Sequence, residues 1–260
     1  MKLANRVAVI TGGAQGIGAA CARHFAEQGA RVVLGDVNEV GAAALVKDIA
    51  AQGGTATFRR TDVGLKADCE ALVEHAVAHY GALDILVNNA GIVHAADFLD
   101  LAEDDFDRVL RINLKGAFLC AQAAARRMVA QPVRTDGQRG VILNISSVNA
   151  VLAIANQVPY TVSKGGLNQL TKVMALGLAP QGIRVMGIGP GSIATELLKT
   201  AVLTNEAARQ RILSRTPLGR LGEPDEVARI AVFLASDDAS YLTGTTLYPD
   251  GGRLALNYVM

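Results

Sequence analysis

Short apolar runs alternate along the whole chain with segments of helical periodicity. The first run, 7–10, is rich in β-branched residues, carries no charge and is typical of a strand buried on both faces. Beyond a glycine-rich turn, apolar residues recur at helical spacing from Ile17 to Phe25, and Gly29 follows as a residue that commonly ends a helix. The pattern therefore predicts a strand, a tight turn and a helix.

The same alternation continues to the end of the chain. Further strands are predicted at 31–34, 55–60, 83–87, 140–145, 184–188 and 245–248, and further helices at about 39–51, 66–80, 103–130, 157–178 and 224–235. Residues 192–222 form the one long stretch without a regular pattern. This order predicts an α/β fold in which about seven strands form a single doubly wound parallel sheet with helices on both faces.

The turn after the first strand reads Thr11-Gly12-Gly13-Ala14-Gln15-Gly16-Ile17-Gly18. A strand, a glycine turn and a helix direct free backbone N–H groups and the positive helix end toward a phosphate. Glycine is needed because a Cβ would block the turn and the close approach of a pyrophosphate. Asp36 ends the second strand, where dinucleotide-binding folds place the carboxylate that binds the adenosine ribose. The segment predicts a Rossmann-like dinucleotide site, and the lack of a following Lys-Ser/Thr pair disfavours a P-loop triphosphatase.

Length and composition narrow the class of protein. The 260 residues, half of them apolar, support one domain over 1–260 with a large core. Mean hydropathy is positive, but no apolar run approaches the roughly 18 residues of a membrane span. The chain runs straight into its first strand, so no signal peptide is expected. A net charge of +1 gives no reason to expect nucleic acid or an anionic membrane as partner.

The three cysteines, Cys21, Cys69 and Cys120, are widely spaced and fall in predicted helices. Such an odd, unclustered set favours a reducing, cytoplasmic compartment and argues against disulfides or a metal site.

Four further motifs follow the glycine turn in order: Asn88-Asn89-Ala90-Gly91, Ser147, Tyr160-x-x-x-Lys164 and Pro190-Gly191. With them the chain resembles the short-chain dehydrogenases/reductases, in their compact branch of about 250 residues, over essentially its whole length. The resemblance implies hydride transfer between a nicotinamide cofactor and an alcohol or ketone.

Tyr160 and Lys164 lie four residues apart on one face of a predicted helix. A phenol with a pKa near 10 is a poor base at neutral pH, and an ammonium about 4 Å away should favour the phenolate. The resemblance implies that Tyr160 is the general acid/base, that Lys164 also holds the nicotinamide ribose, and that Ser147 shares the bonds to the substrate oxygen. Ser146 should face the other way along the strand and be structural. The resemblance also implies that Asn113 disturbs its helix and holds a water that connects to the lysine.

Asp36 indicates the cofactor. A carboxylate there accepts from the 2′- and 3′-hydroxyls and repels a 2′-phosphate, and neither Ala14 nor Gln15 is a cation, so NAD is predicted. The resemblance places Asp62 and Val63 at the adenine and Asn89 near the adenosine, with Asn88 holding the central strands. The expected cofactor-binding residues are Gly12, Gln15, Gly16, Ile17, Gly18, Asp36, Asp62, Val63, Asn89, Ala90, Gly91, Tyr160, Lys164, Pro190, Gly191, Ile193 and Thr195.

The sequence departs from the family at two positions. Met186 stands where the family usually has Asn, which leaves the local packing open, and Gly189 replaces a frequent Ala.

The substrate is less constrained. Residues 192–222 should form a lid, because a long irregular connection in a compact domain is usually functional, and parts of it resemble sugar and polyol dehydrogenases. An apolar stretch at 151–155 would equally suit an aryl or alkyl ketone, a hydroxysteroid or a 3-oxoacyl group. The candidate substrate residues are His94, Ser147, Asn149, Asn156, Gln157 and Glu196. A non-catalytic NAD-sensing protein, or a methyltransferase with this sheet, would not need Ser147, Tyr160 and Lys164 together.

A homotetramer is predicted from two apolar features. The helices at 103–130 and 157–178 carry apolar residues on more faces than one sheet covers, notably in 121–125 and at Leu170, Val173, Met174 and Leu178. The chain also ends in an apolar tail, 253–260. The resemblance pairs these helices across one two-fold axis and the last strand and tail across another. The alternative is a dimer whose tail folds onto its own lid.

Overall fold

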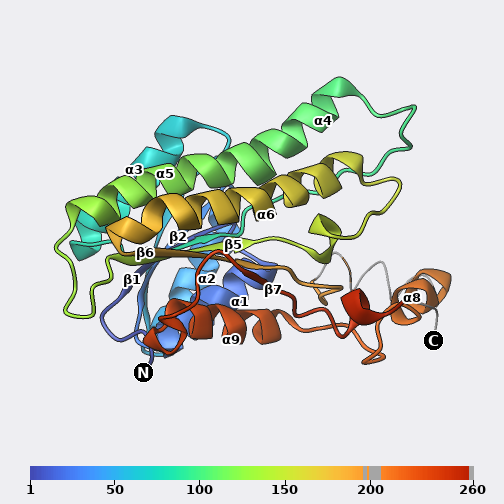
Figure 1. The fold of residues 1–260 in the computed structure, drawn as a ribbon. Coiled ribbons are helices and arrows are strands. Elements are labelled where there is room, and N and C mark those ends of the chain that lie inside the picture. The colour runs from blue at the N-terminus through green and yellow to red at the C-terminus, as the bar shows by residue number, and fades with distance from the viewer. Residues whose placement is uncertain (196–197, 199–205, 258–260) are drawn as a thin grey trace.

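Parallel strands form the central layer of the computed structural model, which describes residues 1–195, 198 and 206–257. Among these residues there are seven strands, in the spatial order β3-β2-β1-β4-β5-β6-β7 (Figure 1). Their bounds are β1 Val7–Thr11, β2 Arg31–Asp36, β3 Thr55–Arg60, β4 Ile85–Asn88, β5 Gly140–Ile145, β6 Ile183–Ile188 and β7 Thr246–Leu247. Every pairing is parallel, as the continuous apolar runs predicted.

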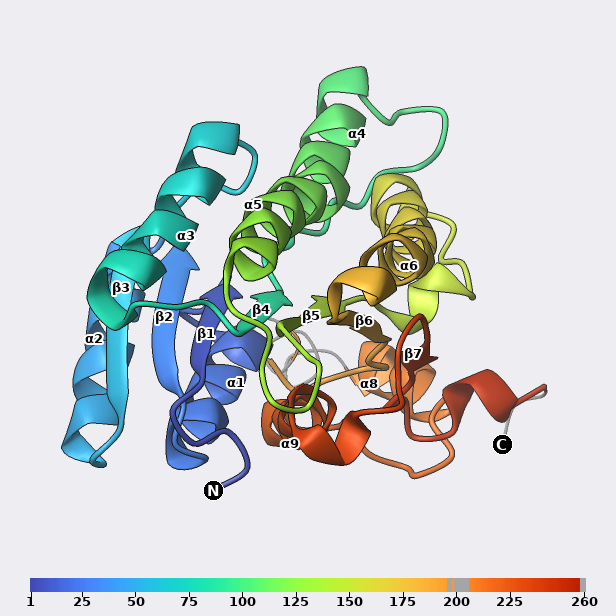
Figure 2. The same cartoon turned by 60° about the vertical axis from the view of Figure 1, so that its left-hand side comes forward.

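Helices cover both faces of the sheet (Figures 1 and 2). One layer holds α3 Lys66–Tyr80, α4 Glu103–Leu110, α5 Gly116–Ala130 and α6 Val158–Leu178. The other holds α1 Gly16–Glu27, α2 Glu39–Ala51 and α9 Pro224–Ala235. Residues of β1 alternate between the two cores, with Ala8 and Ile10 packed toward the α1 side and Val7 and Val9 toward the α3 side. A strand buried on both faces can therefore be apolar at every position.

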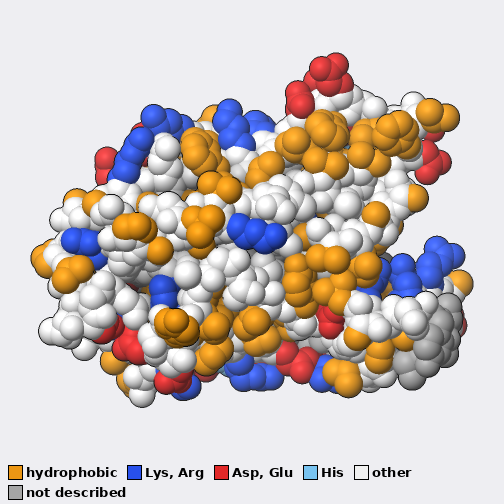
Figure 3. Space-filling model, viewed as in Figure 1, with side chains coloured by type: hydrophobic (Ala, Val, Ile, Leu, Met, Phe, Trp, Pro, Cys, Tyr) orange, Lys and Arg blue, Asp and Glu red, His pale blue; other side chains and the backbone are white. Residues whose placement is uncertain are grey.

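The strand order reverses between β1 and β4. From β1 the chain order runs outward through β2 to β3, and from β4 it runs outward in the opposite direction through β5 and β6 to β7. Ligands of such sheets bind beyond the carboxyl ends of the strands at this point. The glycine turn, Asp36, the 88–91 motif and the 146–147 serines all lie at or just beyond the ends of strands at this edge. Figure 3 shows the surface hollowed here, between the α4–α6 side and the segment around α8 Glu206–Leu213.

Four predicted boundaries need correction. The predicted helix at 103–130 is interrupted by a π-helical turn, Arg111–Lys115. β4 begins at Ile85 rather than at 83, because the backbone of Leu83 is bonded on both sides by the Gln131 side chain, at 2.7 and 3.0 Å. β7 is shorter than predicted. The stretch 192–222 is not irregular throughout, since it contains α8, while 196–197 and 199–205 of the expected lid lie outside the described residues.

The apolar face assigned to subunit contacts is also only partly free. Ala121, Ala124 and Ala125 are buried within the chain, in the core between the sheet and the layer of α3 and α5. Met174 and Leu178 pack against the same core, whereas Val173 is 66% exposed. The small alanine side chains allow α3 to pack closely against α5.

No described helix is both long and apolar enough to cross a membrane.

Candidate active site

The first turns of α6 carry Tyr160 and Lys164. The Lys164 side chain is 4% exposed, and its Nζ donates a hydrogen bond of 2.7 Å to the carbonyl oxygen of Ile145, the last residue of β5. Nζ lies 5.6 Å from the centre of the Tyr160 ring. A buried ammonium thus joins the helix to the carboxyl end of the central sheet, directly beneath the tyrosine.

Ser147 lies two residues beyond that carbonyl. Its Oγ accepts from the backbone N–H of Asn149 at 3.1 Å and also hydrogen-bonds the Tyr160 side chain. Ser146 faces the opposite way, and its Oγ donates to Asn168 at 2.7 Å. The alternation along an extended backbone therefore separates the two serines, with Ser147 on the Tyr160 side.

The charges in this site are set chiefly by burial. Loss of solvent raises the pKa of Tyr160 above its ordinary value of 10, against the opposing hydrogen bond from Ser147. The same cause lowers the pKa of Lys164 to about 8. In the cofactor-free chain the pKa of Tyr160 is therefore raised, with desolvation of the phenolate as the largest cause, and a lowering of this pKa by Lys164 stays a prediction for the complex with the cofactor.

Asn113 occupies the π-helical turn between α4 and α5. Its Nδ2 donates to the carbonyl of Ile92 at 2.9 Å and to Ser163 Oγ at 3.1 Å, and its Oδ1 accepts from the Ile92 N–H at 2.8 Å. The extra residue in this turn accommodates a buried amide that joins the loop after β4 to α6. The water that the resemblance implies beside Asn113 stays a prediction. Ser163, which sequence reasoning did not identify, holds the other end of this link three residues after Tyr160.

The glycine turn has the shape of a phosphate cradle. Gly12 has a φ of +62°, and a Cβ there would lie 2.7 Å from Ala90 Cα. A Cβ on Gly18 would lie 2.1 Å from the Gly12 carbonyl oxygen. Gln15 precedes α1 without a side-chain cap, which leaves the first-turn N–H groups open, and Ile17 packs partly against the core. The residues present therefore fit a bound pyrophosphate.

The 88–91 motif braces that turn. Asn89 Nδ2 donates to the carbonyls of Thr11 and Gly12 at 3.1 and 2.8 Å. Asn88 Nδ2 instead donates to Asn144 Oδ1 at 3.0 Å, across from β4 to β5. A Cβ on Gly91 would lie 3.7 Å from Lys164 Nζ, so the motif also borders the buried lysine.

Asp36 reaches back to the glycine turn. Its Oδ2 accepts from the Ala14 N–H and its Oδ1 from the Asn38 N–H, both at 2.9 Å. On the next strand end, Asp62 Oδ1 accepts from the Gly64 N–H at 2.8 Å, and the neighbouring Val63 is buried. Both carboxylates are thus held by backbone donors at the adenosine end of the predicted cofactor site.

The segment after β6 lies across the opposite end. The Pro190 carbonyl accepts from the Val148 N–H at 3.0 Å, and a Cβ on Gly191 would lie 2.8 Å from Asp250 Cα. Ile193 pairs with Gly222, and Thr195 places its Cγ2 3.4 Å from where a Cβ of Gly16 would be. The chain therefore returns from the catalytic side to the glycine turn.

The candidate substrate residues do not form one group. Asn149 Nδ2 donates to Gln157 Oε1 at 3.2 Å beside Ser147. His94 instead approaches Asp105 of α4, with Nε2 3.5 Å from Oδ2. Asn156 contributes its backbone carbonyl, which accepts from the Ala96 N–H, while its side chain is exposed. Glu196 lies outside the described residues.

Met186 is fully buried. Its sulfur lies 3.5 Å from Arg184, whose guanidinium donates to the carbonyls of Leu234 and Ser236 at 3.0 Å each. The position therefore belongs to the core between β6 and α9, and no polar scaffold is needed there.

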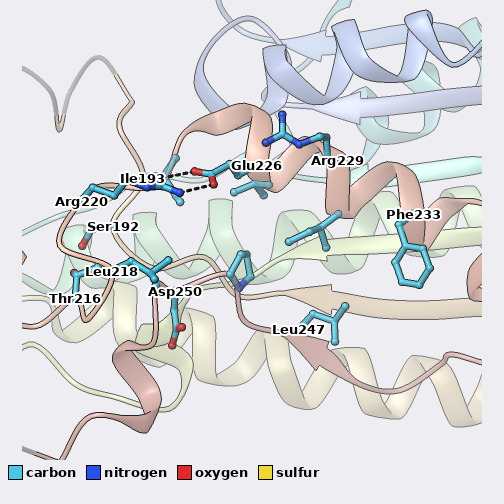
Figure 4. A pocket seen from close by; sticks show the side chains of 15 residues that line it. Ser192, Ile193, Thr216, Leu218, Arg220, Glu226, Arg229, Phe233, Leu247 and Asp250 are labelled. Atoms are coloured by element: carbon cyan, nitrogen blue, oxygen red, sulfur yellow. Dashed lines mark hydrogen bonds and ion pairs between the residues drawn. The ribbon is translucent and has the colours of Figure 1, made fainter.

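A cavity of about 520 Å³ lies between α9 and the end of β7 (Figure 4). Ser192 and Ile193 line it, and Arg220 forms two 2.8 Å bonds with Glu226 at its rim (Figure 4). Neither Tyr160 nor Lys164 lines this cavity, so it is separate from the candidate catalytic groups.

Known proteins resemble the chain over its whole length. A family model described as enoyl-(acyl carrier protein) reductase matches residues 12–253. L-rhamnose 1-dehydrogenase (NAD(P)+) of Azotobacter vinelandii is 44% identical, over 97% of this chain and 98% of its own length. The (2S)-[(R)-hydroxy(phenyl)methyl]succinyl-CoA dehydrogenase subunit BbsD of Thauera aromatica is 41% identical over 97% and 98%. A short-chain type dehydrogenase/reductase from Mycobacterium marinum has a solved structure with a TM-score of 0.90, 35% identity and 98% coverage of each chain.

Lys164→Met should make the cofactor-free protein more stable at pH 7. The unfolded chain keeps the lysine proton up to a pKa near 10.5, whereas the folded chain releases it near 8, so wild-type stability rises with pH between these values. This difference in pKa corresponds to about 3 kcal/mol in the free energy of unfolding at pH 7. The variant also loses the hydrogen bond to Ile145, which subtracts about 1 kcal/mol from that gain. Urea unfolding should therefore show a gain of about 2 kcal/mol at pH 7 that shrinks toward pH 9.5.

The matched control is Lys172→Met, which changes an exposed lysine of the same helix and should show neither effect. A Lys164→Met protein that is less stable than wild type at pH 7, or a difference that does not vary with pH, would contradict the burial of a charged Lys164.

Proposed function

Because the chain belongs to the short-chain dehydrogenase/reductase family, whose members act on CH–OH groups, we propose that it is an NAD-dependent dehydrogenase of a sugar or polyol. It would interconvert a secondary alcohol and a ketone, or a sugar hemiacetal and a lactone. The observation that supports this most strongly is the convergence of Ser147, Tyr160 and Lys164 at the end of β5, beside the 88–91 motif that braces the glycine turn.

The chemistry follows from these positions. A nicotinamide cofactor held by the glycine turn, Asp36 and Lys164 would supply the hydride acceptor. Tyr160 takes the hydroxyl proton in the same step, and Ser147 shares the hydrogen bonds to the substrate oxygen and so orients it. Lys164 Nζ donates one hydrogen bond to the Ile145 carbonyl and has further N–H groups for the ribose hydroxyls. This would place its charge beside the phenol. Lys164 is buried and Tyr160 is half-buried, so little solvent reaches the site of the proton transfer.

Asp36 supports NAD as the preferred cofactor. Its carboxylate stands at the adenosine end with one backbone donor on each oxygen, and it keeps lone pairs for the ribose hydroxyls. Arg60 is its neighbour on β3, but this cation lies 3.6 Å from Glu39, which offsets its attraction for a 2′-phosphate. The NAD(P)+-dependent relative shows that this branch also contains proteins that take both cofactors.

A polar pair beside the catalytic serine supports a hydroxyl-rich substrate. Asn149 and Gln157 are joined to each other, and each amide retains hydrogen-bonding groups for substrate hydroxyls. Similarity to a rhamnose dehydrogenase agrees with this choice.

One observation favours a second candidate, an aryl or acyl substrate. Val151 is 61% exposed just beyond the catalytic serine, and Phe98 is 73% exposed in the loop after β4. An apolar substrate would cover such side chains, and the relative from Thauera acts on a phenyl-bearing thioester. A non-catalytic NAD-sensing role is disfavoured, because it gives no reason for Tyr160, Ser147 and Lys164 to meet.

We infer a cytoplasmic location from the cysteines. Cys21, Cys69 and Cys120 are buried free thiols, and Cys69 and Cys120 hydrogen-bond each other without a covalent link.

The proposal is tested by turnover with Tyr160→Phe as the control. Wild-type protein with NAD should form NADH, read by absorbance, with at least one member of a panel of sugars, polyols, secondary alcohols and hydroxysteroids. Tyr160→Phe should lose at least about a thousandfold in kcat, because the proton acceptor is gone, while calorimetry shows that NAD still binds. A variant within tenfold of wild type would remove Tyr160 as the base.

Asp36 variants test the cofactor preference. Asp36→Ala removes both the charge and the bond to the Ala14 N–H, so NAD binding should weaken and the NAD-to-NADP ratio of kcat/KM should fall by about tenfold or more. Asp36→Asn keeps an oxygen for Ala14 and should lower the ratio with a smaller loss of NAD affinity. An unchanged ratio in both variants would show that the carboxylate does not select the cofactor.

We infer a homotetramer from two surfaces. A groove of about 930 Å³ runs along α4, α5 and α6, with apolar Phe118, Leu170 and Val173 in its lining. Asp104 and Asp107 lie toward one end of α4 and basic residues follow, so a second copy related by a two-fold axis would meet opposite charges. Hydrophobic side chains gather over α4 and α6 in Figure 3. The second surface is the α9–β7 cavity, whose lining includes Gly251, shortly before the predicted tail begins.

Light scattering tests this assembly. The intact chain should run as a tetramer, and Val173→Glu should run as a dimer because a charge would be buried in the first interface. Val40→Glu, at a residue 83% exposed on α2 and outside both surfaces, is the matched control and should remain tetrameric. A truncation after Gly252 should also give a dimer. An intact protein that is monomeric at micromolar concentration would refute the assembly, and a tetrameric truncation would show that the tail is not needed.

A further inference from the structure

Gly189 and Tyr248 share one space at the carboxyl end of the sheet. A Cβ on Gly189 would lie 2.4 Å from Cε1 and 2.5 Å from Cδ1 of the Tyr248 ring. Gly189 is not among the glycines with a positive φ, so its backbone does not require glycine. The missing Cβ instead makes room for the ring. Backbone bonds from Gly189 to Leu247 at 2.7 Å and from Gly191 to Pro249 at 3.0 Å fix Tyr248 in this place.

The Tyr248 hydroxyl reaches α6. Its Oη accepts from Asn168 Nδ2 at 2.8 Å, and Asn168 is one helical turn beyond Lys164. The Oδ1 of the same amide accepts from Ser146 Oγ at 2.7 Å and from Thr246 Oγ1 at 3.4 Å. The orientation of the Asn168 amide is therefore determined from both sides, by an acceptor for its NH₂ and by donors for its oxygen.

Ser146 is the residue between the two points that hold the catalytic side chains. The carbonyl before it, that of Ile145, accepts from Lys164 Nζ, and the residue after it, Ser147, hydrogen-bonds Tyr160. The backbone N–H of Ser146 donates to the Ile188 carbonyl at 2.6 Å, and its Oγ also lies 3.5 Å from the Lys164 carbonyl. Any rotation of Ser146 about the strand axis would displace both neighbours.

We propose that Tyr248 is a positioning residue for the catalytic serine and lysine, acting through Asn168 and Ser146. Without the Tyr248 hydroxyl, the Asn168 amide loses its acceptor and can turn, so Ser146 loses a fixed partner. The segment 145–147 then gains freedom at the two places that align Lys164 and Tyr160. Gly189 is needed for the same network of hydrogen bonds, because an Ala side chain at this position would exclude the Tyr248 ring.

This role rests on the proposed function. It predicts effects that differ from those of a purely structural role. A network that only pins β7 to α6 would change the stability of the fold. A network that aligns Ser147 would change the proton-transfer step and the acidity of Tyr160, and it would leave the adenosine end at Asp36 unaltered.

Tyr248→Phe removes only the hydroxyl and keeps the ring in its space. It should lower kcat by about threefold to tenfold, leave the KM for NAD unchanged, and raise the pKa of Tyr160, since the bond from Ser147 holds that pKa down. In a Ser146→Ala background the same change should have no further effect, because the connection is already broken. Tyr241→Phe, at a fully exposed tyrosine, is the matched control and should match wild type in every readout.

The acidity of Tyr160 is followed by NMR of ¹³Cζ-labelled tyrosine, with the signal assigned by its loss in Tyr160→Phe. This titration requires no substrate, so a wild type inactive on every alcohol would refute the proposed function and leave the positioning role open to measurement. An unmoved Tyr160 titration in Tyr248→Phe would overturn the inference. So would equal effects with and without Ser146, or a fall in melting temperature alone.

Discussion

The hydrogen bond from Lys164 to the Ile145 carbonyl is the interaction on which the candidate active site depends. A charged side chain inside an α/β core is unfavourable unless its donors are satisfied, and this one receives a backbone acceptor at the end of the central strand β5. The geometry that gives Nζ this acceptor also fixes the first turns of α6 against the sheet. Tyr160 is then placed over the lysine and beside Ser147 without further adjustment, so the energetic demand of burial and the alignment of the reacting groups have one solution.

Other buried polar groups hold the rest of the site around this point. Asn113 connects the loop after β4 to α6, and Asn89 fixes the glycine turn from the neighbouring strand end. Each amide uses both its donor and its acceptor capacity or bridges two backbone carbonyls, so each fixes one distance between two elements. Tyr248 extends the same arrangement to the last strand. The sheet supplies rigid strand ends, and a small set of amides and hydroxyls sets their spacing.

Much of this architecture could be predicted from local sequence. The buried strands are continuous apolar runs, and the glycine turn is needed by its own backbone, so β1, the turn and α1 follow from residues 7–29 alone. The separation of Ser146 from Ser147 follows from strand alternation in the same way. These features depend on near neighbours in the chain, and for the same reason the motifs could indicate that Ser147, Tyr160 and Lys164 lie near the end of one strand.

Features that depend on distant residues were missed. The residues near Asn113 do not predict a π-helical turn, because the turn depends on hydrogen bonds from Asn113 to the Ile92 backbone and to Ser163 of another helix. The alanines at 121–125 suggested a subunit contact, although the close packing of α3 covers them. Gly189 is unusual in the sequence, but its partner Tyr248 lies 59 residues away, and only the fold shows that the Tyr248 ring fills the space of the missing Gly189 Cβ. The spacing of Tyr160 and Lys164 in the sequence likewise does not show that burial raises the pKa of Tyr160.

The central claim is that Tyr160 accepts the proton and that buried Lys164 favours its ionised form once the cofactor is present. Its most direct test is the pH dependence of NADH formation in a single turnover, with wild type and Lys164→Met compared on the same alcohol. The wild-type rate should rise with pH through one ionisation, and that ionisation should move to higher pH in the variant because the neighbouring positive charge is lost. Two profiles that superimpose, or a wild-type rate that does not vary with pH, would contradict the account.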